Sequence, residues 1–239
     1  MNGIITGMAA AYGGHPSLTS LEAALFQGES LLSSSPAELS RVAERALEDA
    51  GISSRDRCGL ILLTQPGDSS DPFLSENQDI IILEQLAGDV TIPGALSTAA
   101  EFLGKHPQHQ VLILASDSIG VGALVISQPV SPQEGYARLA LDGIHPETDG
   151  GLESISPRWG EYPPEYLQMP ADPAGLNKDR WEKLAHLWPV DPPHRICALG
   201  GVSTSIGDDS GMAGFIQAVL TLHRRTIPGF PKTLRKQLE

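Results

Sequence analysis

Apolar and polar positions along this chain form two kinds of pattern, one typical of buried strands and one typical of helices. Residues 58–64 and 111–115 are unbroken apolar runs, as strands covered on both faces require. Residues 37–50 lie between Pro36 and Gly51, which favour the start and the end of a helix. Residues 136–144 alternate apolar and polar positions, as a half-exposed strand does.

Extended over the whole chain, these patterns predict alternating strands and helices. The predicted strands are residues 3–8, 58–64, 89–93, 111–115, 119–127, 136–144, 166–170 and 196–199. The predicted helices are residues 17–28, 37–50, 75–86, 94–104, 177–187 and 212–225. Turns or loops are predicted at residues 9–15, 65–72 and 146–164. Alternation of this kind indicates an α/β fold.

Residues 195–229 carry the most informative pattern. The apolar strand at residues 196–199 is broken at Gly200. The Asp and Ser side chains at residues 208–210 can accept hydrogen bonds from the free amides at a helix start, so we predict a helix N-cap there. Apolar side chains then recur mainly at three- and four-residue spacings over residues 212–222, as one buried helix face requires.

Composition excludes several classes of function. The chain has 239 residues, 41% hydrophobic, which is ample for a sizeable core. A formal net charge of -13 argues against a nucleic-acid-binding protein, which needs the opposite sign. Cys58 and Cys197 both lie in apolar runs, which favours buried free thiols in a reducing cytoplasm. No basic leader and no apolar stretch of membrane length is present, so we expect a cytoplasmic protein without a membrane span.

The order strand, polar glycine turn and small-residue helix resembles the last motif of ketosynthases of the thiolase superfamily. Those enzymes carry Lys-Ser-Asn-Ile-Gly-His at this place. Here Ser203 stands at the Lys position and Ser205 at the Asn, Ile206 and Gly207 match, and Asp208 stands at the catalytic His. The resemblance covers most of residues 3–229 in outline.

The resemblance implies a thiolase-like fold, an α-β-α-β-α layered sandwich. It implies one shortened domain over residues 1–239, with a first thiolase half at residues 1–128 and a reduced second half at residues 129–239. The family adds two further strands and a Gly-Phe-Gly-Gly-Thr-Asn turn after this helix. The sequence ends at Glu239 without them. We therefore expect the second half to be incomplete.

The resemblance also implies that the catalytic groups are replaced. Ketosynthases hold the acyl chain on a Cys at a helix start, and two His stabilise the developing enolate. The corresponding positions here are Gly94 or Ala95 for the Cys, Ala171 for the first His and Asp208 for the second. No catalytic residue is therefore predicted. An ionised Asp208 would repel an enolate.

The family dimerises through the strand before the nucleophile, so that each sheet continues into its partner's. We assign that strand to residues 89–93, and expect residues 74–86 to face the partner as well. The predicted interface and tunnel residues are Asp89, Val90, Thr91, Ile92, Pro93, Gly94, Ala95 and Leu96.

These features predict a non-catalytic subunit, a chain length factor, that forms a heterodimer with an active ketosynthase. It is most similar to the small chain length factor of aryl polyene biosynthesis, where acyl carrier protein would be an indirect partner. The histidines show no metal-ligand spacing, and we predict neither metal nor cofactor. Two alternatives stay open: a thioester hydrolase or acyltransferase that uses Ser203, Ser205 or Asp208, and a homodimeric acyl-binding module.

Overall fold

The computed structural model of the chain describes residues 2–29, 31, 38–53, 55–64, 80–87, 92–117, 119–128, 135–140, 166–168, 198–200 and 211–226. Strands and helices alternate within them, which confirms the α/β prediction. The elements, in chain order, are β1 (Asn2–Tyr12), α1 (Leu18–Phe26), α2 (Leu39–Asp49), β2 (Cys58–Thr64), β3 (Ile81–Ala87), α4 (Ile92–Lys105), β4 (Gln110–Asp117), β5 (Gly120–Ser127), β6 (Ala137–Ala140), β7 (Tyr166–Gln168), β8 (Ala198–Gly200) and α7 (Met212–Arg224).

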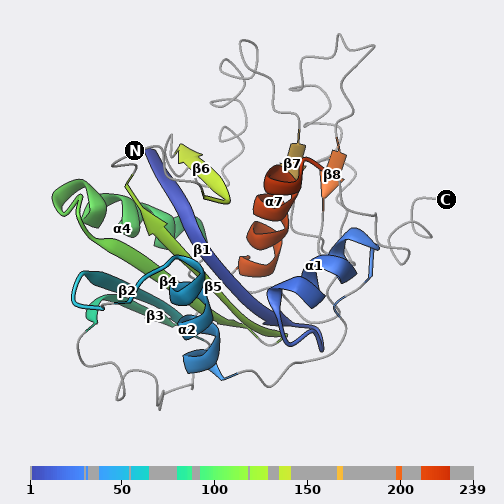
Figure 1. Cartoon of the computed structure of the whole chain (residues 1–239), viewed down its shortest axis with the longest axis horizontal. Helices are drawn as coiled ribbons and strands as arrows, with labels where there is room; N and C mark the ends of the chain where they lie inside the picture. Colours follow the sequence, from blue (N-terminus) through green and yellow to red (C-terminus); the bar gives the residue numbers. More distant parts are fainter. Residues whose placement is uncertain are drawn as a thin grey trace, which may run out of the picture.

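A six-stranded mixed sheet forms the centre of the described structure (Figure 1). Its strand order is β3-β2-β4-β5-β1-β6, so β3 and β6 lie at the two edges. Strands β3, β2 and β4 run parallel, whereas β5 is antiparallel to both β4 and β1, and β6 is antiparallel to β1. A second sheet consists of β7 and β8, which pair in parallel, and α7 contacts both of them.

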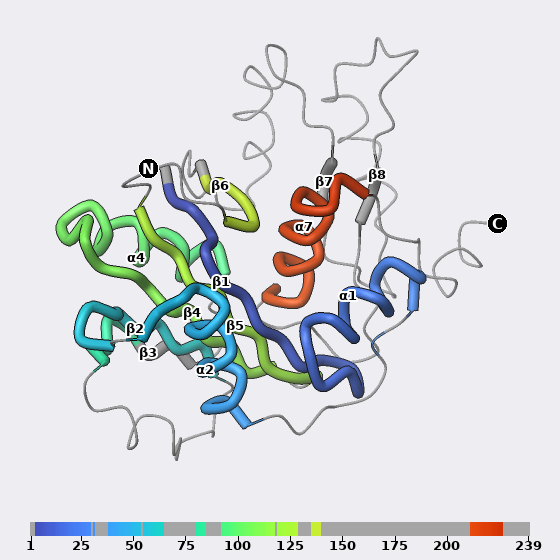
Figure 2. The backbone as a smooth tube through the Cα atoms, in the orientation of Figure 1, coloured from blue at the N-terminus to red at the C-terminus, as the bar shows by residue number. Residues whose placement is uncertain are grey.

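The large sheet is covered on both faces, as the unbroken apolar runs predicted (Figure 2). One face packs against α1, α4 and α7, with Tyr12, Ile61 and Ile113 among the fully buried side chains. The other face packs against α2, with Leu62 and Leu112 buried beneath it. The layers α2, sheet, inner helices and second sheet follow one another, as in the predicted sandwich.

Glycine allows the closest helix contacts with the sheet. A Cβ on Gly7 would lie 2.3 Å from the carbonyl oxygen of Ala46, so this glycine lets α2 lie directly on β1. On the opposite face, a Cβ on Gly122 would lie 2.5 Å from Cγ of Met212 and 3.0 Å from Cδ1 of Ile216. Gly122 therefore sets how closely α7 approaches β5.

Two predicted elements next to the candidate interface are wrong. The helix predicted at residues 75–86 is contradicted by β3, which pairs with β2 along its length; residues 71–79 lie outside the described residues. The strand predicted at residues 89–93 is contradicted at its last two residues, because α4 begins at Ile92 and has Pro93 in its first turn; residues 88–91 lie outside the described residues. Proline fits there, because the first amides of a helix have no acceptor within it. The strand that precedes this helix is therefore β3.

Other boundaries also differ from the predictions. β1 continues to Tyr12 through part of the turn predicted at residues 9–15, because its small side chains alternate between the two packed faces. Gly200 is the last residue of β8, one position beyond the predicted strand, whose first two residues lie outside the described residues. The N-cap of α7 is Gly211, with φ 75° and no side-chain cap, whereas the Ser17 side chain caps α1 by accepting a hydrogen bond from the amide of Ser20. The predicted helix at residues 177–187 and the loop at residues 146–164 lie outside the described residues.

Candidate functional site

The first turn of α4 is where the resemblance places the ketosynthase nucleophile. Ile92, Ala95 and Leu96 are buried in the core between the sheet and the inner helices, whereas Pro93 is exposed and Gly94 is half-buried. Ile92 to Leu96 have no thiol, hydroxyl or imidazole among their side chains. The remaining predicted site residues, Asp89, Val90, Thr91, Ala171 and Asp208, lie outside the described residues. Their assignment stays a prediction.

A buried polar pair, which the sequence patterns did not single out, lies at one end of the sheet. Tyr12 and Asp117 both pair with Gly120, because β5 lies between β1 and β4 in the sheet. The Tyr12 hydroxyl donates a hydrogen bond to Oδ2 of Asp117 at 3.1 Å, and both side chains are buried. The pair ties the ends of β1 and β4 together.

β3 forms one edge of the large sheet, and no described strand pairs with its outer side. Ile81 and Ile82 are 44% and 54% exposed, which is unusual for isoleucine on a strand beside the core. Further along β3, Oε2 of Glu84 accepts a hydrogen bond of 2.6 Å from Oγ1 of Thr98 on α4. This bond fixes the edge strand to the helix that carries Gly94.

The described thiol does not provide a nucleophile. Cys58 is fully buried at the start of β2, and burial raises the pKa of its thiol from 9.0 to about 11. The thiol therefore stays protonated near neutral pH, and only thiolate is an effective nucleophile. Around the end of α4, the rings of Phe102, His106 and His109 pack together, with the two imidazoles 5.2 Å apart. Within the described residues, no three His, Cys, Asp or Glu side chains come together as a metal site would require.

Two comparisons, with protein-family models and with curated proteins, return no match. Comparison with solved structures returns ketosynthases. An oxazolomycin ketosynthase domain, OzmH KS8 of Streptomyces albus, is 18% identical with a TM-score of 0.70, over 96% of this chain and 81% of that one. A ketosynthase in a complex with a type II acyl-carrier protein, AntDE:AntF, is 11% identical with a TM-score of 0.65, over 95% and 93%. The PfaC ketosynthase-chain length factor is 13% identical with a TM-score of 0.64, over 92% and 39%.

The share of each solved structure that this chain covers differs widely. Nearly all of this chain aligns with each of them, whereas it spans only 39% of the PfaC structure. Within the described residues, no helix is long and apolar enough to cross a membrane. Strand order, the helices on each face and the solved structures agree with one another, so the chain has the thiolase-like layered α/β fold of the ketosynthases.

Proposed function

We propose that this chain is a non-catalytic ketosynthase-like subunit that pairs with an active β-ketoacyl synthase and completes its acyl-binding site. The observation that carries the proposal is a combination of two features: the β3 edge, with which no described strand pairs on its outer side, and a first turn of α4 that has no nucleophilic side chain. The first feature calls for a partner strand, because an edge with exposed isoleucines is prone to pairing. The second removes the group that would hold an acyl chain.

Carbon-carbon bond formation in this fold depends on a thiolate and on hydrogen-bond donors for the enolate. Such donors contribute several kcal/mol of transition-state stabilisation, about 3–4 for one of them. With Gly94, Ala171 and Asp208 at the three positions, the chain would lack the nucleophile and both imidazole donors. The partner ketosynthase then supplies all of the chemistry.

The geometry of β3 supports an interface that reaches the acyl site. β3 precedes α4, and the bond between Glu84 and Thr98 connects the two. A partner strand paired with β3 would therefore lie beside the helix whose first turn contains Gly94 and Ala95. In such a complex these residues would form part of the wall that limits how far the acyl chain extends.

A finer assignment is a chain length factor, with an aryl polyene pathway as its setting. The solved ketosynthase-chain length factor with this fold supports the first part. The aryl polyene setting rests on the resemblance of the sequence. Acyl carrier protein would be an indirect partner, delivered to the active subunit, as the solved complex of a ketosynthase with its carrier protein suggests.

The test is an activity assay with the two subunits expressed together. The complex with an intact ketosynthase should elongate an acyl-carrier-bound substrate. Replacement of the partner's nucleophilic Cys by Ala should abolish all product, and this chain alone should neither condense nor hydrolyse the thioester. Product formation by the complex with the inactive partner, or thioester hydrolysis by this chain alone, would contradict the proposal and favour a reassigned active site.

A further inference from the structure

A pocket of about 320 Å³ lies at the C-terminal end of α7, between that helix, α1 and the start of β6. The volume is at the lower end of the range for small-molecule sites. Its lining combines Leu220 and the ring of Tyr136 with polar groups from Thr19, Glu22, His223 and Arg224. The 13 residues of α7 place this end about 20 Å from the helix N-terminus. No residue of β3 or α4 lines the pocket, so it is separate from the candidate site.

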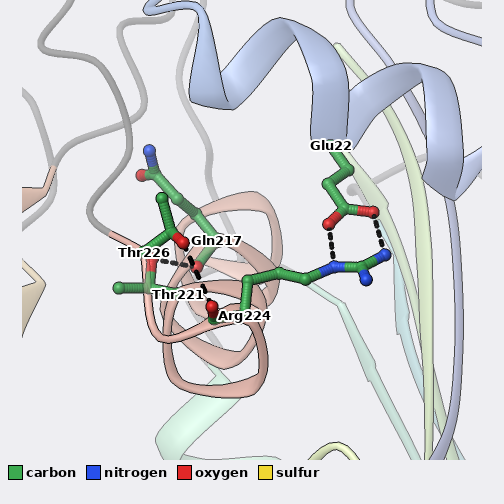
Figure 3. Close-up of polar contacts among 5 residues, drawn as sticks. All are labelled: Glu22, Gln217, Thr221, Arg224 and Thr226. Carbon is green, nitrogen blue, oxygen red and sulfur yellow. Dashed lines mark hydrogen bonds and ion pairs between the residues drawn. The ribbon is translucent and has the colours of Figure 1, made fainter.

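An ion pair between α1 and α7 controls the charge of this pocket (Figure 3). Nε and Nη2 of Arg224 donate to the two carboxylate oxygens of Glu22, the second at 3.1 Å. The Glu22 side chain is only 16% exposed, so its charge is matched by this guanidinium. Nη1 takes no part in the pair and has no acceptor within the described residues. It offers a charged donor to a third group.

The opposite wall provides a flat apolar surface with a second donor. The His223 imidazole packs against the Tyr136 ring, with centroids 4.9 Å apart and an angle of 49° between the planes. Burial and, to a smaller extent, the carboxylate of Asp49 raise the pKa of Tyr136. The phenol therefore stays neutral and presents its ring, while an imidazole nitrogen of His223 can donate.

We propose that this pocket binds a small amphipathic carboxylate. The carboxylate accepts hydrogen bonds from Nη1 of Arg224, from His223 and from the Thr19 hydroxyl, and the apolar body packs between Leu220 and the Tyr136 ring. Guanidinium-carboxylate bonds are directional and charge-assisted, which favours an acid over a neutral molecule of the same shape. Because Glu22 already engages two nitrogens of Arg224, it limits the affinity of a second carboxylate.

The test is a titration of the full chain with hexanoate and benzoate, followed by saturation-transfer NMR. Hexanol and benzyl alcohol serve as neutral probes of the same size and should bind at least about tenfold more weakly. Two variants remove the same ion pair from opposite sides: one leaves the largely buried Glu22 unpaired and the other leaves the more exposed Arg224 unpaired, so the stability of each is measured beside its binding. Arg224→Gln should weaken binding of the acids by about tenfold, whereas Glu22→Gln should strengthen it several-fold because the guanidinium loses its internal counterion.

Two results would overturn the proposal: equal binding of the acids and the alcohols, or a change of the same sign and size in both variants. If Arg224→Gln fails to fold, as judged by circular dichroism, Arg224→Lys provides the second comparison. It keeps the charge but loses the planar fork, and should bind the acids more weakly than the wild type. Association with a ketosynthase should be unchanged in Glu22→Gln, so this site and the proposed function are tested separately.

Discussion

Replacing Ile81 and Ile82 by lysine should abolish association with the ketosynthase and leave the fold of the chain intact. Both side chains lie on the edge strand β3, and they are 44% and 54% exposed in the isolated chain. A lysine at such positions costs the free chain little, because its ammonium reaches water. In the complex the same charges would lie against the side chains of the partner strand that pairs with β3. Native proteins use lysine on edge strands to prevent this kind of pairing.

The magnitude follows from the exposed fraction of each side chain. Full burial of an isoleucine contributes roughly 1.5–3 kcal/mol. Covering the exposed half of each side chain would therefore contribute about 1 kcal/mol, and both together about 2 kcal/mol. Desolvation of two ammonium groups adds a further cost. The dissociation constant should rise by at least about 30-fold, since about 1.4 kcal/mol corresponds to a factor of ten.

The assay is isothermal titration of the purified chain, or of the variant, with the active ketosynthase. Leu222→Lys is the matched control, because Leu222 is an equally exposed aliphatic residue, 59% exposed, on α7 instead of β3. That variant should bind like the wild type. Unchanged affinity in the Ile81→Lys, Ile82→Lys double variant, with an unchanged melting temperature, would refute pairing through β3.

Three further predictions concern packing, pH and the acyl site. Gly122→Ala should lower the unfolding free energy, measured by urea denaturation, by about 1–3 kcal/mol, because its Cβ would lie 2.5 Å from Cγ of Met212 on α7. Gly104→Ala is the control: a Cβ there would have nothing within 4 Å, so the unfolding free energy should be unchanged or slightly higher. Burial raises the pKa of the Cys58 thiol from 9.0 to about 11, so folding favours the protonated thiol. This stabilisation is complete below pH 9 and is lost as the pH rises to 11. The difference in unfolding free energy between the wild type and Cys58→Ala should therefore shrink by roughly 2 kcal/mol between pH 9 and pH 11. In the active complex, Gly94→Val should shorten the products, whereas Ala95→Leu, at a fully buried position, should mainly destabilise the chain; products of unchanged length from Gly94→Val would assign the chain a scaffold role only.

The central part of the fold could be predicted from sequence because its signals are local. The apolar runs that form β2 and β4 have side chains buried on both faces, so the sequence shows an unbroken apolar run that directly indicates a buried strand. Ser17 begins a helix through its own side-chain bond to the amide of Ser20, so that boundary needs no tertiary contact. The order of elements and the resemblance then lead to one fold.

The prediction failed where tertiary contacts decide the structure. Residues 81–87 contain Leu, Glu, Gln and Ala, which favour a helix, yet pairing with β2 holds them as a strand. Because residues 81–87 form the edge strand, the candidate interface is β3 instead of residues 89–93. The bond between Tyr12 and Asp117 joins residues 105 positions apart, and it depends on strand order, which sequence patterns do not encode. The pocket at the end of α7 joins four segments, from β1, α1, the residues before β6 and α7, for the same reason.

Native mass spectrometry of the chain expressed together with an active ketosynthase tests the central claim most directly. Pairing through β3 predicts one dominant species that contains one copy of each chain, and predicts its loss in the Ile81→Lys, Ile82→Lys variant. A chain that stays separate from the ketosynthase, as a monomer or as a homodimer of itself, would contradict the account.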